Sequence, residues 1–294
     1  MDLIDIRNLT KDYGNHKGIF DVSFSIKKGE IVGFIGSNGA GKTTTIRHLM
    51  GFIHPQQGTA RIMNIDCFKQ ADKIQKQIGY LPGEIAFMDQ MNGYEFIRFM
   101  AKMKNIKDLH YAEELISYLE LDPSVKIKKM SKGMKQKIGL IIAFMQNAPI
   151  LILDEPTSGL DPLMQNKFVD LIRKEKEAGK TILMSSHIFE EIEHTCDRVI
   201  VIKDGMIIAD ENMNKIKTER NKHYEITFRN QKDAILFQNK YSDSTRNENT
   251  IKYISKGDVN GLIQELSKYD IMDINARYQT LEEVFMRYYG GEEK

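Results

Sequence analysis

Residues 36–44 read GSNGAGKTT, a glycine-rich stretch that satisfies the pattern G-x-x-x-x-G-K-[ST]. An apolar run precedes it and the helix-like run KTTTIRHLM follows, so the context that the pattern requires is present. In such a loop, backbone N–H groups curl around phosphates, and the helix adds partial positive charge at its N-terminus. Chance alone gives this pattern in roughly one chain in a hundred of this length. We therefore predict a phosphate-binding loop.

Two side chains of this loop have expected roles of their own. Lys42 is expected to reach the β- and γ-phosphates of a nucleotide, and the Thr43 hydroxyl is expected to hold Mg²⁺. The full set expected to contact the nucleotide is Gly36, Ser37, Asn38, Gly39, Ala40, Gly41, Lys42, Thr43 and Thr44.

A second candidate segment, ILILDEPTSGLDP, spans residues 150–162. Its apolar residues lead to Asp154, which fits a carboxylate fixed at the end of a buried strand to orient Mg²⁺. Glu155 follows and is the candidate general base for the water that attacks the terminal phosphate. A lone Asp-Glu pair at a strand end is more often a turn. Here it lies about 110 residues beyond the phosphate loop, and a further acidic residue follows at Asp161.

His187 is the histidine with a candidate chemical role. The chain has seven histidines, and most, including His48 and His194, are expected to be surface or packed residues. His187 differs because it ends the apolar run TILMSSH, at the edge where the phosphates are expected. A histidine there can donate a hydrogen bond to the γ-phosphate and hold the attacking water in line.

The lysine-rich stretch KMSKGMKQK, residues 129–137, contains a candidate anion site. Ser131 lies two residues before Gly133 and has the position of a helix N-cap. A serine N-cap, free backbone N–H groups and nearby cations together suit an anion. For most of the lysines around it, we expect only a solvated helix face.

These residues need a sheet to position them. The apolar runs at residues 30–36, 150–155, 181–187 and 198–202 have the lengths of strands buried on both faces of a parallel sheet. The chemistry is then expected at their carboxyl ends. Residues 20–26 alternate apolar and polar, as in a strand with one buried face. The region between the first two runs is mostly helical, and a capping-box pair, Asn92 and Glu95, begins one helix there. The apolar positions expected on one face of that helix are Phe96, Phe99, Met100 and Met103.

The texture of the chain changes beyond about residue 215. The polar stretch KIKTERNKH is a plausible linker. Strands are then expected at 223–228, 250–255 and 271–276, with helices at 231–240 and around 259–266. The second helix is expected to bury Val259, Leu262, Ile263 and Leu266. A last helix begins with the capping box Thr280 and Glu283 and ends at Gly290. This gives a small α/β domain.

Composition limits the function classes. The 294 residues carry a formal net charge of +1, which gives no electrostatic case for nucleic acid as a partner. The longest apolar run, residues 138–145, is far shorter than a membrane span, and the first ten residues do not resemble a signal peptide. Two distant cysteines, Cys67 and Cys196, indicate free thiols in a reducing compartment.

The order of these motifs resembles the nucleotide-binding subunit of an ATP-binding cassette (ABC) transporter, over about residues 1–215. The resemblance implies an α/β P-loop NTPase fold with a parallel-sheet core, an antiparallel β subdomain and a helical subdomain at about residues 82–145. The small C-terminal α/β domain, residues 220–294, is an addition. The cofactors implied are ATP and Mg²⁺, and the implied activity is ATP hydrolysis coupled to transmembrane transport.

The resemblance also implies roles for further residues of this chain, some of them toward a second subunit. Tyr13, 23 residues before Gly36, is implied to stack on adenine; the alternative is a core tyrosine near a turn. The signature residues Ser131, Lys132, Gly133 and Met134 are implied to close on the γ-phosphate that a second cassette holds. Asp161 is implied to belong to a loop that touches the other subunit's site. The dimer is a homodimer or a heterodimer.

Two positions depart from the family pattern. The signature usually reads LSGGQ and here reads MSKGM, a form that many bacterial exporter cassettes share. A glutamine is usual in the stretch that here reads YLPGEIAF, where Gly83 takes its place with Glu84 beside it. Glu84 is a candidate to contact Mg²⁺ or the attacking water.

A cassette without a membrane span implies a partner, an integral-membrane permease on a separate chain. Residues 85–103 are rich in Met and Phe, and in the family this region receives a cytoplasmic helix of the permease. Packing of the helical subdomain is the other explanation for about half of these residues. The implied location is peripheral, on the cytoplasmic face of the cell membrane. The branch that the chain resembles serves bacterial exporters of drugs, antimicrobial peptides or lipid-linked molecules. The C-terminal domain is expected to act either in dimer contact or in regulation.

Two other classes are weighed against this one. The first is a soluble ABC ATPase acting on ribosomes, DNA or a signalling partner. Those that act on translation usually carry two cassettes in one chain and those that act on DNA carry long heptad insertions, and neither feature occurs here. An ordinary P-loop kinase or GTPase leaves Ser131, Gly133 and His187 without a role.

Overall fold

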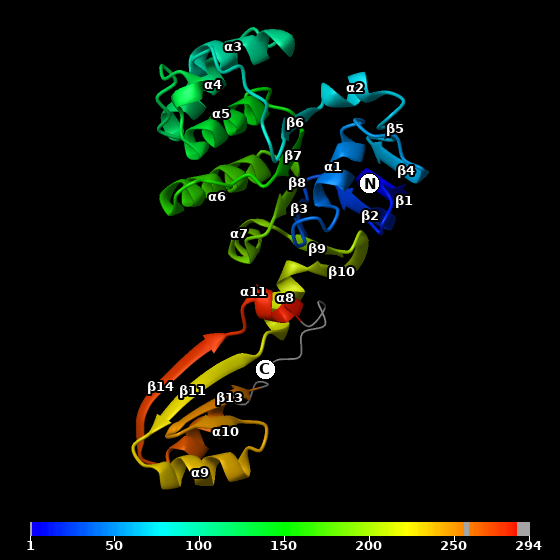
Figure 1. Ribbon diagram of the computed structural model, residues 1–294. Helices are drawn as coiled ribbons and strands as arrows, with labels where there is room; N and C mark the ends of the chain where they lie inside the picture. Colours follow the sequence, from blue (N-terminus) through cyan, green and yellow to red (C-terminus); the bar gives the residue numbers. More distant parts are fainter. Residues whose placement is uncertain (1, 256–258, 287–294) are drawn as a thin grey trace. The chain divides into compact units, whose positions relative to one another are not determined.

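Two units make up the chain, Met1–Met213 and Asn214–Lys294. The structure is a computed structural model, and it describes residues 2–255 and 259–286 (Figure 1). Each unit has its own sheets and its own buried apolar residues.

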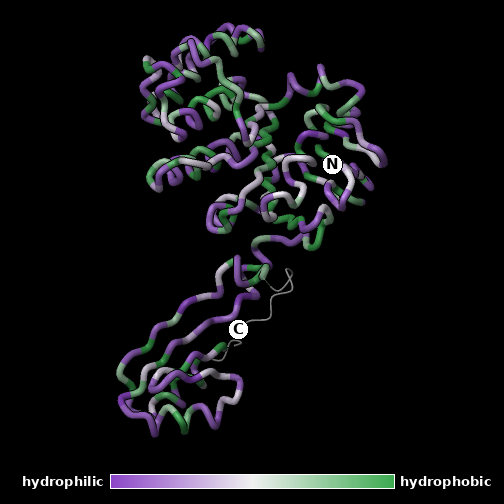
Figure 2. The backbone as a smooth tube through the Cα atoms, viewed as in Figure 1, coloured by the Kyte–Doolittle hydropathy of each residue, from purple (hydrophilic) through white to green (hydrophobic). Residues whose placement is uncertain are grey.

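A six-stranded sheet forms the centre of the first unit, with the order β10-β9-β3-β8-β7-β6. Its strands are β3 (Ile31–Ile35), β6 (Ile78–Leu81), β7 (Ile150–Asp154), β8 (Thr181–Ser186), β9 (Arg198–Lys203) and β10 (Met206–Asn212). All pair in parallel except β10, which pairs antiparallel with β9. Every residue of β3, β7 and β8 is buried. The four apolar runs are therefore confirmed as buried strands that pair in parallel. Figure 2 colours the backbone by hydropathy, and the centre of this unit is largely hydrophobic.

The parallel arrangement brings the carboxyl ends of four neighbouring strands to one edge. Beyond β3 comes the glycine-rich loop, beyond β6 the segment 82–84, at the end of β7 Asp154 and Glu155, and beyond β8 His187. Because neighbouring parallel strands end side by side, segments more than a hundred residues apart in sequence meet at this edge.

An antiparallel sheet packs against the same core. Its order is β2-β1-β4-β5, and its strands are β1 (Asp2–Asp12), β2 (Gly18–Lys27), β4 (Gln57–Ile62) and β5 (Ile65–Asp66). Val22, Phe24 and Ile26 of β2 are buried, which confirms the alternation expected for this strand. One apolar cluster joins them to Val32 and Phe34 of the central sheet.

The first unit also contains helices. They are α1 (Lys42–Leu49), α2 (Ala71–Gln75), α3 (Gly93–Met103), α4 (His110–Tyr118), α5 (Lys132–Phe144), α6 (Pro162–Glu177) and α7 (Phe189–Thr195), with a 3-10 turn η1 (Ile127–Lys129). The capping box that begins α3 is confirmed, since Asn92 and Glu95 bond each other's backbone N–H groups at 2.8 Å. On its predicted apolar face, Phe96 is buried but Met103 is 67% exposed.

The second unit is an antiparallel sheet with the order β12-β13-β11-β14. Its elements are β11 (Lys222–Phe228), α9 (Gln231–Lys240), β12 (Thr245–Asn247), β13 (Thr250–Ser255), α10 (Val259–Leu266), β14 (Ile271–Tyr278) and α11 (Leu281–Met286). This βαββαβ order confirms every element expected between residues 223 and 276 and adds the short strand β12. The capping box of Thr280 and Glu283 is also confirmed. The expected end at Gly290 lies outside the described residues.

Two expectations for this part of the chain are wrong. The predicted linker is partly a helix, α8 (Met213–Glu219), because Met213 and Ile216 are apolar at helical spacing and both are buried. Ile263 was expected to face the core and is 59% exposed, since Leu262 and Leu266 fill that side of α10. Glu265 of the same helix is buried instead, and its carboxylate accepts a hydrogen bond from Lys240 Nζ at 2.6 Å.

Candidate functional site

A cavity of about 680 Å³ opens at the carboxyl edge of the central sheet. Its walls include residues 37–39 and 41–44 of the glycine-rich loop, 82–84 beyond β6, and Glu155 and His187. The structure thus brings the three main predicted motifs together around one space.

The backbone of the glycine-rich loop requires its glycines. Gly39 and Gly41 have φ of 83° and 114°, in the region that favours glycine, and Gly41 is the N-cap of α1. A Cβ on Gly36 would lie 2.5 Å from the carbonyl oxygen of Ile202. The loop therefore curls tightly over the start of α1, where free N–H groups and the helix dipole suit phosphates.

Lys42 extends back over this loop. Its ammonium donates to the Gly36 carbonyl at 2.6 Å and to the Ser37 carbonyl at 3.3 Å. It also lies 3.4 Å from Glu155 Oε1, and the residue is only 6% exposed. A buried cation is thereby held between the loop and the acidic pair.

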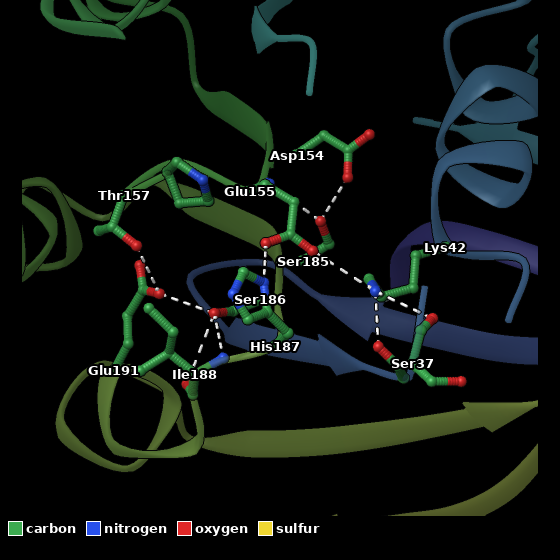
Figure 3. Close-up of polar contacts among 12 residues, drawn as sticks. Ser37, Lys42, Asp154, Glu155, Thr157, Ser185, Ser186, His187, Ile188 and Glu191 are labelled. Carbon is green, nitrogen blue, oxygen red and sulfur yellow. Dashed lines mark hydrogen bonds and ion pairs between the residues drawn. The ribbon is translucent and has the colours of Figure 1, made fainter. Parts of the chain in front are cut away.

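Thr43 and Asp154 meet across 111 residues of sequence, as Thr43 Oγ1 donates to Asp154 Oδ2 at 2.8 Å. Asp154 is fully buried, and its other oxygen accepts a hydrogen bond from Ser185 Oγ (Figure 3). A hydroxyl and a carboxylate oxygen at one point form a donor set of the kind that Mg²⁺ prefers. The residues present therefore fit the ion expected from the sequence.

Glu155 and His187 form a close pair in the same cavity. His187 Nδ1 lies 2.5 Å from Glu155 Oε2 (Figure 3). Glu155 has a φ of 52°, and its N–H donates to Ser185 O at 3.2 Å and to Ser185 Oγ at 3.1 Å. These bonds hold the turn after β7, so that the Glu155 carboxylate lies between His187 and the Lys42 ammonium.

The signature stretch begins α5, as expected, with Ser131 as its N-cap. Ser131 Oγ accepts the N–H of Met134 at 3.2 Å, and the Ser131 residue is exposed. Gly133 lies against the β7–α6 loop, since a Cβ there would meet the Gly159 carbonyl oxygen at 2.7 Å. Lys132 lines the chain's own cavity, whereas Ser131 and Gly133 do not.

Three other predicted site residues, Asp161, Tyr13 and Glu84, differ in whether they line the cavity. Asp161 is exposed and is the N-cap of α6, accepting the Met164 N–H at 3.0 Å. Tyr13 is 55% exposed and does not line the cavity, so it is not the core tyrosine of the alternative explanation. Gly83 and Glu84 both line the cavity, and a Cβ on Gly83 would lie 3.2 Å from Asp154 Oδ2.

Sequence reasoning missed the polar residues that support the site. Ser185 pairs in register with Asp154 across β7 and β8, and Gln136 of α5 donates to the Glu155 and Pro156 carbonyls at 3.1 and 2.8 Å. Glu191 of α7 accepts bonds from Thr157 and Ser186. The one signal available was the pair of serines directly before His187.

Comparison with known proteins finds both a family model and individual relatives. Residues 19–158 match the family model described as "ABC transporter". The chain is 32% identical over 300 residues to the bacitracin transport ATP-binding protein BcrA of Bacillus licheniformis, covering 98% of each chain. It is 34% identical to the linearmycin resistance ATP-binding protein LnrL of Bacillus subtilis, covering 70% of this chain and 68% of LnrL.

Solved structures are similar as well. The ATP-binding subunit of an ABC transporter has a TM-score of 0.67 and 30% identity, covering 74% of this chain and 92% of that one. The dimeric bacterial ABC transporter cassette MJ0796 has a TM-score of 0.65 and 25% identity, covering 71% of this chain and 98% of that one.

The fold and the site define a P-loop ATPase of the cassette type. The chain belongs to the ABC transporter family, as an ATP-binding subunit that hydrolyses ATP to power transport. The predicted fold class and activity are thereby confirmed, and the soluble-factor and kinase alternatives are not favoured.

Proposed function

We propose that this chain powers export of an antimicrobial peptide or a similar antibiotic through a permease on a separate chain. The support for this substrate class is the match to BcrA, which extends through the C-terminal domain as well as the cassette. No helix among the described residues has the length and apolar character needed to cross a membrane. The proposed location is peripheral, on the cytoplasmic face of the cell membrane.

The observation that carries the coupling to a permease is a wall shared by two cavities. A second cavity, of about 640 Å³, has mainly apolar walls that include Phe52, Phe96 and Met100. Tyr80 and Pro82 line both this cavity and the nucleotide cavity. The phosphate site and the apolar cavity therefore share one short segment of the chain. The apolar cavity is a groove that suits a short helix of a permease. Flexible methionines favour such docking.

In the proposed reaction, each side chain of the site has one task. The glycine-rich loop and Lys42 bind the phosphates and offset their charge. Thr43 and Asp154 would hold Mg²⁺, and the ion would supply charge stabilisation at the phosphates. Glu155 accepts a proton from the attacking water, and His187 holds the Glu155 carboxylate in place and donates to the γ-phosphate. Tyr13 stacks on adenine, and Glu84 is a further candidate oxygen ligand for Mg²⁺.

The site is proposed to be complete only in a pair of cassettes. Ser131 and Gly133, at the start of α5, offer a hydroxyl, N–H groups and a helix N-terminus, and neither residue lines the chain's own nucleotide cavity. In a facing copy these groups, with Lys132 and Met134, close on the γ-phosphate, and Asp161 lies in the loop between the two sites. ATP then favours the closed pair because it binds that state better.

Transport in inverted membrane vesicles tests this function. Vesicles containing the chain and its permease are expected to accumulate labelled bacitracin when ATP is added, because export from the cell is inward transport there. Vesicles with Glu155→Gln are expected to accumulate none. Met100→Glu places a charge in the apolar groove and is expected to abolish uptake while ATP affinity stays unchanged. If vesicles with the wild-type chain hydrolyse ATP but never accumulate the peptide, the proposed substrate class is wrong.

A further inference from the structure

Glu191 is a buried carboxyl group next to the site, and the reaction above gives it no task. It lies on α7 and is only 7% exposed. Glu191 Oε2 accepts two hydrogen bonds, from Ser186 Oγ at 2.7 Å and from Thr157 Oγ1 at 3.0 Å (Figure 3). Its other oxygen, Oε1, is buried with no hydrogen-bond partner among the described residues.

The two hydroxyls belong to the turns that carry the reactive pair. Thr157 follows Glu155 by two residues in the turn after β7, and Ser186 directly precedes His187 at the end of β8. Ser186 Oγ also accepts the N–H of Ile188 at 2.9 Å, which closes a turn around His187. One carboxylate oxygen therefore connects two turns that are far apart in sequence and that carry the two partners of the 2.5 Å contact.

We infer that Glu191 is a positioning residue of the ATPase site, which sets the distance between Glu155 and His187 by holding their two turns together. The inference rests on the roles proposed above for Glu155 and His187. Glu191 itself does not line the nucleotide cavity, so it acts only through these two residues.

An ordinary packing role explains the carboxyl group poorly. Burying a carboxylate that lacks a partner on one oxygen is unfavourable, and an apolar side chain would avoid that penalty. Burial is the main cause that raises the pKa of Glu191 to about 7, the charge of Glu155 acts in the same direction, and the hydrogen bonds from Ser186 and Thr157 act against it. The bonds to the two hydroxyls are the interactions that only an oxygen acceptor at this place supplies.

The test compares Glu191→Ala and Glu191→Gln in the full chain. The alanine variant is expected to lower kcat for ATP hydrolysis about tenfold or more, with ATP affinity within about twofold, because the phosphate loop is untouched. The glutamine variant keeps an acceptor oxygen and is expected to retain kcat within about threefold. Glu190→Gln, on the same helix with a side chain that is 84% exposed, is the matched control and is expected to behave as wild type. Unchanged kcat in the alanine variant, or equal losses in both Glu191 variants, overturns the inference.

A second variant covers the case in which the alanine variant does not fold. Thr157→Val keeps the shape of a side chain that is 4% exposed and removes one of the two hydroxyls. Its kcat is expected to fall severalfold at unchanged ATP affinity, and a wild-type kcat contradicts the inference.

Glu155→Gln, measured in parallel, distinguishes a failure of the proposed reaction from a failure of the role inferred for Glu191. If it retains wild-type turnover, the proposed reaction fails. If it loses turnover while Glu191→Ala does not, only the role of Glu191 fails. In the Glu155→Gln background, adding Glu191→Ala is expected to cause no further loss, because both changes affect the same pair. A further tenfold loss there means that Glu191 acts elsewhere.

Discussion

His187 Nδ1 lies 2.5 Å from Glu155 Oε2, although 32 residues and the helix α6 separate the two in sequence. Neither residue is in a position to meet the other until β7 and β8 pair in parallel, with Asp154 opposite Ser185. The pair therefore depends on sheet register, and Glu155 also lies 3.4 Å from the ammonium of Lys42. This geometry places the proposed general base beside the predicted phosphate loop.

Glu155→Gln is expected to keep ATP binding and to lower the turnover of ATP about a hundredfold or more. The amide has the same shape but cannot accept the proton of the attacking water. Steady-state hydrolysis and ATP titration measure the two quantities separately. Glu177→Gln, an exposed glutamate at the end of α6, is the control. An unchanged hydrolysis rate would remove Glu155 as the base.

Lys42→Ala is expected to weaken ATP binding about tenfold or more. The ammonium is held over the loop by the Gly36 carbonyl at 2.6 Å, and without it the phosphate charge is poorly offset. Isothermal titration calorimetry gives the affinity directly. Lys174→Ala, an exposed lysine of α6, is the matched control. Undiminished affinity in Lys42→Ala contradicts the phosphate-binding loop.

Mixing two inactive variants tests the shared site. Ser131→Arg blocks the signature of one chain, and Lys42→Ala disables the phosphate loop of the other. Each variant alone is expected to be inactive. The mixed pair recovers at most one working site of two, because only one intact loop faces an intact signature. Full wild-type hydrolysis by the mixture, or none at any mixing ratio, argues against the arrangement.

Glu191 is expected to make the stability of the fold depend on pH. Burial raises its pKa from the ordinary 4.5 to about 7, and the charges of Glu155 and His187 act in opposite directions on it. The folded chain then binds more protons than the unfolded chain between these values, so its free energy of unfolding falls as pH rises from about 4.5 to 7. The loss attributable to this one group is at most about 3 kcal/mol.

Glu191→Gln removes the titrating carboxyl group and, with it, the pH dependence of stability that Glu191 causes. The Tm of the variant relative to wild type is therefore expected to rise between pH 5 and pH 8 and to level off above that. Thermal unfolding at both pH values measures the difference. A difference in Tm that is the same at both pH values would show that Glu191 does not titrate in this range.

The sequence by itself predicted most of the catalytic frame. Residues 36–44 and the acidic pair at 154–155 each follow an apolar run of strand length, and the carboxyl ends of parallel strands meet at one edge. Local patterns of this kind also predicted the helix after Asn92 and the N-cap at Ser131, because capping depends on residues three positions apart.

Only the tertiary structure decided which supporting groups touch the reactive ones. Ser185 reaches Asp154 through strand register, and Gln136 reaches the Glu155 carbonyl through the packing of α5. Glu191 joins two turns through the packing of α7. A serine, a glutamine or a glutamate on a helix or strand has the same local pattern whether it faces water or a buried oxygen. Contacts between elements distant in sequence follow from burial and register, which no short stretch of residues specifies.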